Sequence, residues 1–476
     1  MNITIVGGGT AGWITAYFLD SIQPNCHNIT VIESSKIGIL GAGEGSTGFF
    51  TNMLNGHFFP RVQQVDDFIS KCDATNKIGI EFHNWLGKND KFFSPLDGSP
   101  SCVSMDDIIF KYVISEYGNN KAHLASRLGL DYEHRTNFNK IDSLHFDAHK
   151  VGKFFKEICE KDGVKTIDAI VTDVATSNEG IEYLTLDNGS KIESDMFFDC
   201  SGFARVLMKE LNDPWISYSD KLPLNAAMPF LVQYEENEYP DPWTRATALN
   251  AGWMWDIPLK TRRGCGYVYN SNFLSPQEAQ QEVEQYLNKK IEPIKHLSFD
   301  PGRGTNFWIG NTISVGLSSC FVEPLQATSI HTTIAQLALF GNDFLQPSKE
   351  KTCLEVNKNS YNRKCSQMYE KTLDFISLHY QCGREDTPFW KHVKNNNYVT
   401  DYAKEILEIS KNRVIGYHES TSAFGIAAMA LWNWTIAGFG LFNEKSAKED
   451  LERKLVDRDA GKWYAAFKEH MYGRPK

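Results

Sequence analysis

The stretch ITIVGGGTAG, residues 3–12, decides the fold of this chain. Residues 3–6 are all β-branched and favour a buried strand, and the glycines after them lead into a helical pattern over residues 10–23 that Pro24 ends. A second strand, rich in β-branched residues, follows at residues 28–32. This βαβ order predicts an α/β fold with a parallel sheet.

The glycines between the first strand and the helix fit the pattern GxGxxG, from Gly7 to Gly12. Such glycines let the backbone approach a pyrophosphate at a helix N-terminus, where N–H groups favour an anion. Glu33 ends the second strand, 21 residues after Gly12, where an acid can bind a ribose hydroxyl. A structural glycine turn is the alternative, but strand, helix and acid together favour a dinucleotide site. These residues leave open whether the dinucleotide is FAD or NAD.

Composition limits the classes of protein to consider. The 476 residues are enough for two or three modules. The net charge is −10, and 49 Lys and Arg residues are interspersed with 59 Asp and Glu residues, so neither nucleic acid nor an anionic membrane is an expected partner. The chain shows no signal-peptide pattern and no apolar run near the roughly 20 residues of a membrane span, so we expect a cytoplasmic protein.

Metal binding is not expected. Ten cysteines are scattered without CxxC or zinc-ligand spacing, and reduced thiols are the simplest account. His145 and His149 stand four residues apart and could share one helix face as ligands, but no HExxH-type acid accompanies them. A solvated helix start, with Asp147 in its first turn, is the favoured interpretation.

The rest of the chain continues to alternate strands and helices. We expect a helix over residues 148–162, strands up to residue 198 with a hairpin turn at residues 187–189, and a more antiparallel sheet over residues 223–272. Helical patterns dominate from about residue 334. Within the sheet, GWMWDIP at residues 252–258 places Trp253 and Trp255 on one strand face, an aromatic wall that, taken alone, is best explained as core.

Three further segments follow the first fingerprint: GAGEGSTG at residues 41–48, DCSGFARVL at 199–207 and WIGNTISVGLSSCFVEP at 308–324. In this order they resemble the FAD-binding layout of flavoprotein monooxygenases. A typical hydroxylase of that class has Gly-Asp where this chain has Gly316-Leu317. This departure counts against a simple aromatic hydroxylase.

Seven segments together resemble a more specific family, the flavin-dependent tryptophan halogenases. They are GGGTAGW, GAGEGS, NKIGIEFHNW, DCSGF, GWMWDIP, GYVY and FVEPLQATSI, and the resemblance extends to about Trp390. It implies a FAD-binding module over residues 1–345, with an interleaved mixed sheet at about 215–295, and a mainly helical substrate module over residues 346–476. The residues implied to bind FAD are Gly7, Gly9, Thr10, Ala11, Gly12, Glu33, Ala42, Glu44, Ser46, Val171, Leu317 and Ile330.

The resemblance also implies the reaction. In the family, FADH2, O2 and a halide ion give hypohalous acid at the flavin, and the acid passes through a tunnel to a lysine beside the substrate. Lys77 in NKIGIEFHNW matches that lysine, although a lone lysine on a short strand is otherwise a solvated edge charge. Neutral Lys77 could form a haloamine, and protonated Lys77 could polarise the acid, so both routes stay open.

Other residues take their roles from the same resemblance. Trp253 and Trp255 would separate the flavin from the substrate. Thr328 and Ser329 would bind the halide, although Ser329 replaces a glycine of the family and so alters the halide pocket. No nicotinamide site is evident, so a separate flavin reductase is the expected partner that supplies FADH2.

Some positions depart from the family in ways that bear on the substrate. Gln326 stands where the family has a glutamate that orients or activates the hypohalous acid, and an amide cannot act as a base at neutral pH. Either another group substitutes or the reaction tolerates the loss. Ser94 and Leu96 replace residues that stack on an indole, and no clamp for an amino acid backbone is matched around Trp432 and Trp434.

These departures predict an electron-rich aromatic substrate, an indole or a phenol, other than free tryptophan. A weaker activating group at position 326 also favours bromide or iodide over chloride. The alternatives are a flavin-dependent aromatic monooxygenase and a catalytically impaired flavin-binding protein.

Overall fold

The computed structural model describes residues 1–38, 44–59, 61, 65–95, 143–416, 419, 429–446 and 449. The chain forms two compact units. Unit 1 comprises Met1–Ala74, Phe146–Ser219 and Asp300–Glu370, and unit 2 comprises Thr75–His145, Asp220–Phe299 and Lys371–Lys476. Each unit is assembled from three separate stretches of chain, whereas the modules expected from the sequence meet at one boundary near residue 345.

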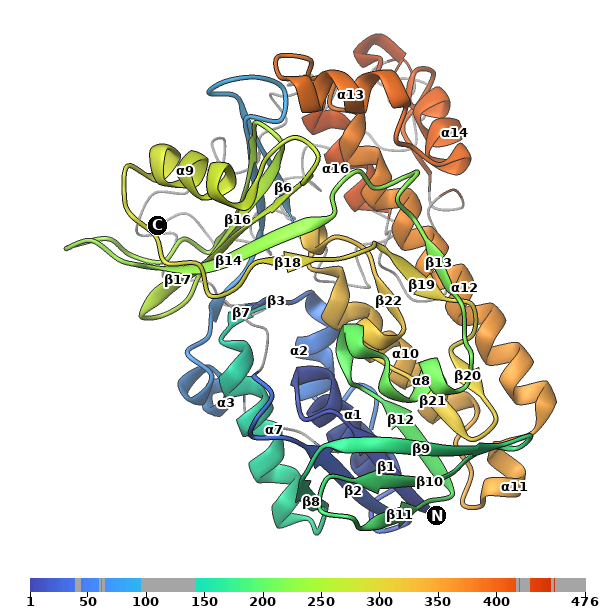
Figure 1. The fold of residues 1–476 in the computed structure, drawn as a ribbon. Helices are drawn as coiled ribbons and strands as arrows, with labels where there is room; N and C mark the ends of the chain where they lie inside the picture. Colours follow the sequence, from blue (N-terminus) through green and yellow to red (C-terminus); the bar gives the residue numbers. More distant parts are fainter. Residues whose placement is uncertain are drawn as a thin grey trace. The chain divides into compact units, whose positions relative to one another are not determined.

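Unit 1 is built on a six-stranded sheet in the order β20-β21-β12-β1-β2-β8 (Figure 1). Its strands are β1 (Asn2–Val6), β2 (Asn28–Glu33), β8 (Lys165–Asp168), β12 (Met196–Asp199), β20 (Trp308–Ile309) and β21 (Thr312–Ser314). Neighbouring strands are parallel, except for β20 and β21. The predicted α/β class and the βαβ opening are therefore confirmed.

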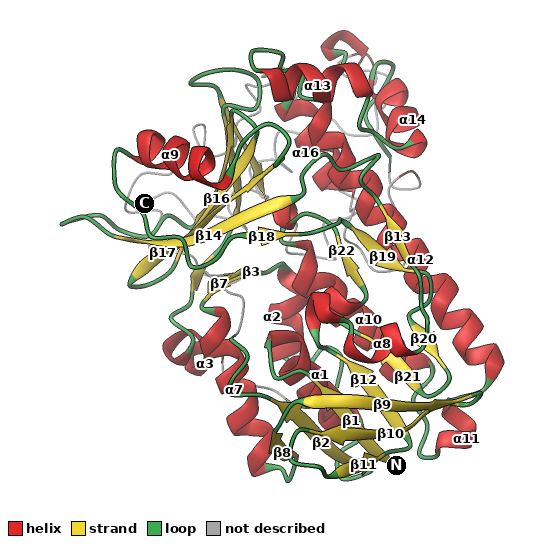
Figure 2. Cartoon of the chain, viewed as in Figure 1, coloured by secondary structure: helices red, strands yellow, loops and turns green. Residues whose placement is uncertain are grey.

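Helices cover this sheet beside the glycine turn. Helix α1 (Thr10–Ile22) packs against β1 and β2, and also against α7 (Ala148–Lys161) and α10 (Thr328–Asp343) (Figure 2). The helix expected over residues 148–162 is confirmed, and Asp147 caps it by accepting a hydrogen bond from the His149 N–H. Unit 1 also contains α2 (Gly48–Leu54), α3 (Val65–Lys71), α8 (Val206–Glu210), α11 (Lys349–Thr352) and the first part of α12 (Glu355–Leu378).

Unit 1 also has two small antiparallel sheets. One joins β9 (Val171–Ser177), β10 (Gly180–Leu186) and β11 (Lys191–Glu193), with the predicted hairpin turn between β10 and β11. Leu184 and Leu186 of this sheet are buried in one cluster with Val6 and Ile32. The other joins β13 (Trp215–Ser217), β19 (Gly302–Gly304) and β22 (Cys320–Phe321).

Unit 2 is built on a seven-stranded sheet in the order β18-β14-β17-β16-β15-β5-β6. Its strands are β5 (Gly79–His83), β6 (Lys91–Pro95), β14 (Ala226–Gln233), β15 (Trp243–Leu249), β16 (Gly252–Pro258), β17 (Arg262–Tyr269) and β18 (Leu297–Ser298). Only β15 and β5 are parallel among these neighbours. The antiparallel sheet expected over residues 223–272 is thus confirmed, and its pairing with β5 explains why both stretches belong to one unit.

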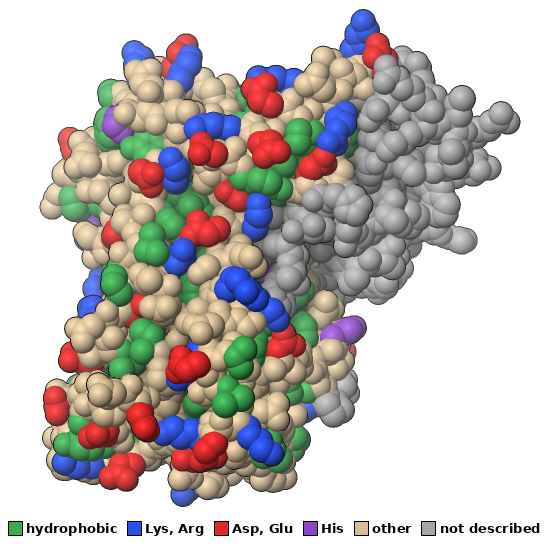
Figure 3. Space-filling view, turned by 90° about the vertical axis from the view of Figure 1, so that its right-hand side faces the viewer, with side chains coloured by type: hydrophobic (Ala, Val, Ile, Leu, Met, Phe, Trp, Pro, Cys, Tyr) green, Lys and Arg blue, Asp and Glu red, His purple; other side chains and the backbone are tan. Residues whose placement is uncertain are grey.

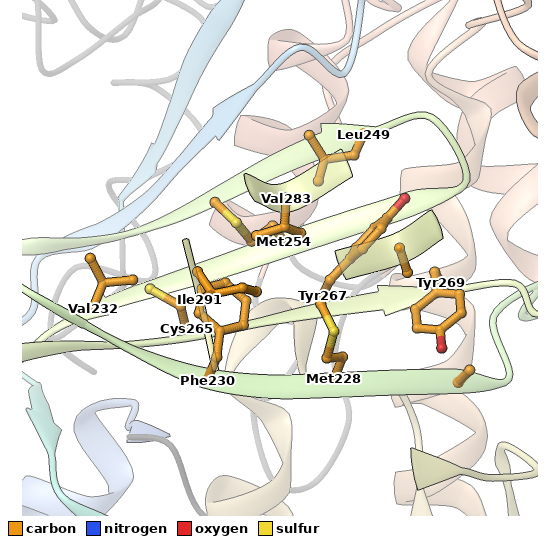
Figure 4. Packing of buried hydrophobic residues seen from close by; sticks show 12 residues of the cluster. Met228, Phe230, Val232, Leu249, Met254, Cys265, Tyr267, Tyr269, Val283 and Ile291 are labelled. Carbon is orange, nitrogen blue, oxygen red and sulfur yellow. The ribbon is translucent and has the colours of Figure 1, made fainter. Parts of the chain in front are cut away.

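One face of this sheet forms a hydrophobic core with helix α9 (Pro276–Leu287) (Figure 4). Phe230 and Met254 on the strands and Ala279 and Val283 on the helix are buried in this cluster. Because side chains alternate along a strand, Met254 faces this core while its two tryptophan neighbours face away. Unit 2 also contains α13 (Pro388–Asn396), α14 (Asp401–Ser410) and α16 (Met429–Gly438).

The tryptophan face of β16 depends on a glycine of the next strand. The ring centroids of Trp253 and Trp255 are 6.3 Å apart at an interplanar angle of 61°, an edge-to-face contact. Trp253 is buried and Trp255 is partly exposed. Gly266 lies opposite Trp255, and a Cβ atom on Gly266 would lie 2.0 Å from the indole. The missing side chain therefore makes the room that the Trp255 ring occupies.

Charged side chains of both signs lie on the surface of the described residues. On the face that Figure 3 shows, Lys and Arg side chains are interspersed with Asp and Glu side chains among the coloured residues. None of the described helices is long and apolar enough to cross a membrane. The described His, Cys, Asp and Glu residues form no group of three that could hold a metal ion.

We expect Gly266→Ala to destabilise the protein by about 1–3 kcal/mol, because the new methyl group overlaps the Trp255 indole. Urea unfolding followed by tryptophan fluorescence measures this loss. Gly38→Ala is the matched control, since a Cβ atom there meets nothing within 4 Å. Equal unfolding midpoints for the two variants would contradict the close packing of Trp255 on Gly266.

Candidate active site

The glycine turn after β1 leaves no space for side chains at Gly7, Gly8 and Gly12. Gly7 has φ +117°, and a Cβ atom there would lie 2.3 Å from the carbonyl oxygen of Cys200. A Cβ atom on Gly12 would lie 1.8 Å from the Gly7 oxygen, whereas one on Gly9 meets nothing within 4 Å. Gly9 is the N-cap of α1 and makes no side-chain cap, so no side chain of the cap residue covers the first N–H groups of the helix. This shape fits a pyrophosphate.

Glu33 ends β2 and lies directly beside this turn. A Cβ atom on Gly8 would lie 2.2 Å from Glu33 Oε2. The carboxylate accepts hydrogen bonds from Trp13 Nε1 (3.1 Å) and Lys156 Nζ (2.5 Å). The Glu33 carbonyl accepts from the Ala169 N–H (2.8 Å), two residues before β9 begins at Val171. Two of the expected FAD-binding residues, Glu33 and Val171, thus lie near the carboxyl ends of the paired strands β2 and β8.

Thr10 and Ala11 begin helix α1, and Ala11 lies close to a second turn. The Thr10 hydroxyl donates to the Ala148 carbonyl (3.4 Å). Gly316 opens the short 3₁₀ helix η3 (Gly316–Ser318) with φ +67°, and a Cβ atom on Gly316 would lie 2.9 Å from the Ala11 Cβ. The half-buried Leu317 follows in η3. The residues expected near the flavin from residues 7–12 and 316–317 therefore lie together in unit 1.

Asp199 is a residue whose importance the sequence reasoning missed. Its Oδ1 accepts hydrogen bonds from Ser201 N (3.1 Å), Ser201 Oγ (2.5 Å) and Ser318 Oγ (3.1 Å). Its Oδ2 accepts from the N–H groups of Leu207 (2.9 Å) and Met208 (3.0 Å) at the start of α8. The sequence did contain a signal for this role: an acid at the end of a predicted strand, shortly before a short helix, can cap that helix.

The start of α10 has the features of an anion site. The 3₁₀ helix η4 (Pro324–Gln326) precedes it, and Ala327, with φ +55°, is its N-cap without a side-chain cap. Thr328 is fully buried, and its Oγ1 has no hydrogen-bond partner. Ser329 is partly exposed, while Ile330 is buried. Together, an unpaired hydroxyl and the first N–H groups of a 16-residue helix favour a small anion.

Gln326 is buried at the end of η4, two residues before α10 begins. One turn after Thr328, His331 is also buried. Its Nδ1 lies 2.7 Å from Thr47 Oγ1, and its ring stacks on Phe49 at 4.4 Å. The sequence reasoning did not single out His331, although its spacing from Thr328 places both on one helix face.

The segment before Thr47 carries two further expected FAD-binding residues. Glu44 lies on β3 (Glu44–Gly45), and burial, followed by the charge of Asp147, raises its pKa to about 7. Ser46 is fully buried. Ala42 lies outside the described residues.

Lys77 in unit 2 is buried and is not a solvated edge charge. It follows β4 (Thr75–Asn76), and its N–H donates to the Ser143 carbonyl (2.9 Å). Its exposed fraction is 1%. Burial lowers the pKa of Lys77 to about 7. A pKa near 7 leaves both expected lysine routes accessible, because the neutral amine and the ammonium form are each populated near neutral pH.

The interpretation of His145 as part of a solvated helix start is wrong. His145 lies on β7 (Leu144–Phe146) and is fully buried, because it pairs with Thr75 of β4 in an antiparallel ladder. Only His149 belongs to the helix, which starts after its cap Asp147. The pair therefore does not share a helix face.

Ser94 lies on β6, and Trp432 and Trp434 lie on α16, which packs against β6. Ser94 is buried and its Oγ has no hydrogen-bond partner; Leu96 lies outside the described residues. Phe92 stacks on Phe82 with centroids 4.7 Å apart and planes 5° apart. Trp432 Nε1 on α16 is likewise buried without a partner, and Trp434 is buried.

These features fit the cofactor that the fold implies. The cramped glycine turn would hold the pyrophosphate, Glu33 would hold the ribose, and the start of α10 would hold a halide. Gly7, Gly12 and Gly316 each lie where a side chain would collide with neighbouring atoms.

Comparisons with known proteins identify the family of this chain. The tryptophan halogenase family model matches residues 2–450. The tryptophan 7-halogenase RebH of Lentzea aerocolonigenes is 32% identical over 423 residues, which cover 83% of this chain and 78% of RebH.

Solved structures lead to the same family. Tar14, a tryptophan C-6 flavin-dependent halogenase from taromycin biosynthesis, is 26% identical with a TM-score of 0.79, and the match covers 99% of this chain and 97% of Tar14. BrvH, a flavin-dependent halogenase from Brevundimonas sp. BAL3, is 27% identical with a TM-score of 0.79 over 100% of this chain and 97% of BrvH. The chain therefore belongs to the tryptophan halogenase family of flavin-dependent enzymes.

Proposed function

We propose that the protein halogenates an electron-rich aromatic of the indole or phenol type, with FADH2, O2 and a halide ion as co-reactants. The observation that carries this proposal is the burial of Lys77, which lowers its pKa to about 7. Bound FADH2 supplies, with O2 and halide, the hypohalous acid that Lys77 delivers. RebH and Tar14 are described as tryptophan halogenases, which supports an electron-rich aromatic as the substrate class.

The residues of unit 1 bind and orient. Gly7, Gly9 and Gly12 accept the pyrophosphate because they leave backbone N–H groups accessible, and Glu33 accepts the ribose hydroxyls. Thr328 donates its hydroxyl to the halide, helped by the first N–H groups of α10. FADH2 comes from a separate flavin reductase.

Lys77 acts on the hypohalous acid in unit 2. As a neutral amine it would form an N–halogen bond while the halogen–oxygen bond of the acid breaks, and the hydroxyl leaves as water with a proton from the amine. As an ammonium group it would donate a hydrogen bond that polarises the acid. Trp253 and Trp255 keep the flavin away from the substrate. Gln326 can hold the acid by a hydrogen bond but cannot take its proton.

The substrate differs from free tryptophan in this proposal. Ser94 offers a hydroxyl in place of a stacking ring, and Phe92 is already stacked on Phe82. Because Gln326 activates less strongly than a carboxylate, the more easily oxidised bromide or iodide is preferred over chloride.

We expect Lys77→Met to lower the halogenation rate by at least about 10²-fold, within the range of a lost acid–base group, while FAD affinity stays unchanged. The wild-type rate should change near pH 7: it rises with pH if the neutral amine reacts and falls if the ammonium group donates. Lys77→Arg separates these routes, since arginine keeps its proton. Full activity in Lys77→Met would refute the role of Lys77.

We expect Thr328→Val to raise the KM for bromide about fivefold or more, because a hydrogen bond of about 1 kcal/mol is lost without a change in shape. Steady-state rates at varied bromide concentration measure this. Thr328→Ser keeps the hydroxyl and should retain the wild-type KM. An unchanged KM in Thr328→Val places the halide elsewhere.

The reaction class follows from product analysis by mass spectrometry. Indole, phenol and tryptophan are incubated with the protein, a flavin reductase, catalase and chloride, bromide and iodide at equal concentrations. We expect monobrominated or monoiodinated indole or phenol, and less tryptophan product. Efficient chlorination of tryptophan would contradict both preferences, hydroxylation without halogen would identify a monooxygenase, and no product despite FAD binding would identify an impaired protein.

A further inference from the structure

The ladder of β4 and β7 places Lys77 beside His145. Thr75 lies opposite His145, and Asn76 lies opposite Leu144. The Lys77 N–H donates to the Ser143 carbonyl (2.9 Å) and continues the ladder by one residue. Residues two apart on a strand, and residues directly opposite, share a face. Thr75, Lys77 and His145 therefore lie on one face, with Lys77 diagonal to His145.

The hydrogen bonds of His145 fix which ring nitrogen carries the hydrogen. Its Nδ1 lies 3.3 Å from Thr75 Oγ1, and its Nε2 lies 2.9 Å from Thr244 Oγ1. The Thr75 hydroxyl donates its single hydrogen to the Pro258 carbonyl (2.6 Å), so toward His145 it can only accept. Nδ1 is therefore the donor, and Nε2 of the neutral ring accepts from the Thr244 hydroxyl.

His145 also stays uncharged. Burial and then the charge of Lys77 lower its pKa well below the ordinary value. Thr75, Ser143 and Thr244, which adjoin the pair, carry no charge. The ring is thus a fixed, neutral neighbour of the lysine and does not compete for its proton.

We propose that His145 is a positioning residue for Lys77: a neutral imidazole, held in one tautomer by Thr75 and Thr244, that fixes the place of the lysine side chain without supplying a counter-charge. A carboxylate in the same place would hold the ammonium form, because an opposite charge favours it. The inference rests on the proposed function of Lys77.

One test measures the protonation of Lys77 through protein stability and does not depend on the halogenation reaction. The pKa of Lys77 is about 7 in the folded protein and near 10 in the unfolded chain. Between these two pH values, the unfolded chain binds a proton at Lys77 that the folded protein has lost. The free energy of unfolding of the wild type, compared with that of Lys77→Met, therefore rises with pH over this range. Urea unfolding of both proteins at a series of pH values gives the onset of this rise. We expect the onset near pH 7 in wild type and in His145→Asn, and at least one pH unit higher in His145→Asp.

A second test reads the position of Lys77. His145→Phe keeps a ring of similar size but makes neither hydrogen bond, so it should lower kcat for halogenation at least tenfold with little change in substrate KM or FAD affinity. His145→Asn keeps a neutral donor and acceptor and should restore part of kcat.

The outcomes separate the two proposals. The role of His145 is overturned if the pH onset of the stability rise is unchanged in His145→Asp. It is also overturned if a folded His145→Phe keeps the full kcat. In both cases Lys77→Met remains inactive, so the proposed function stands. If His145→Asp does not fold, His145→Phe and His145→Asn decide the question. Halogenation that survives Lys77→Met defeats the proposed function itself, whatever the onset shows.

Discussion

The buried carboxylate of Asp199 holds together the cofactor side of unit 1. It accepts five hydrogen bonds, from Ser201 twice, from Ser318, and from Leu207 and Met208. A charge removed from water is tolerated only when such donors surround it, so β12, η3 and α8 cannot shift independently. Because Gly316 of η3 lies against Ala11, the same carboxylate also sets where the glycine turn of α1 meets η3.

In unit 2, the burial of Lys77 determines whether its side chain carries a proton. The ammonium form of Lys77 is disfavoured away from water, and its neighbour His145 is a ring whose two nitrogens are already used by threonine hydroxyls. Thr244 belongs to β15 and Thr75 to β4, so strands of two different sheets orient the imidazole. The chemistry proposed for this enzyme thus depends on strand pairing as much as on the lysine.

Local patterns predicted much of this structure, and long-range pairing explains most of what they missed. The strand, glycine turn and helix of residues 3–22 follow from β-branching and GxGxxG, which act over a few residues. His145 looked like part of a helix because HFDAH suits one, yet its pairing with Thr75, 70 residues away, makes it a strand residue. The contact of Thr47 with His331 spans 284 residues, and no spacing rule reaches that far. The resemblance to halogenases identified Lys77, but only the fold shows its burial.

The bonds of Glu33 bear on how tightly a flavin is held. Both carboxylate oxygens already have donors from the protein, the Trp13 indole and the Lys156 ammonium. When a ribose leaves, the Glu33 carboxylate still has its two protein donors. When a ribose arrives, its hydroxyls must share the carboxylate with Trp13 and Lys156 or replace them. Under the proposed function, such an acid suits a flavin that enters and departs with every catalytic cycle, as a co-substrate, better than one retained as a permanent prosthetic group.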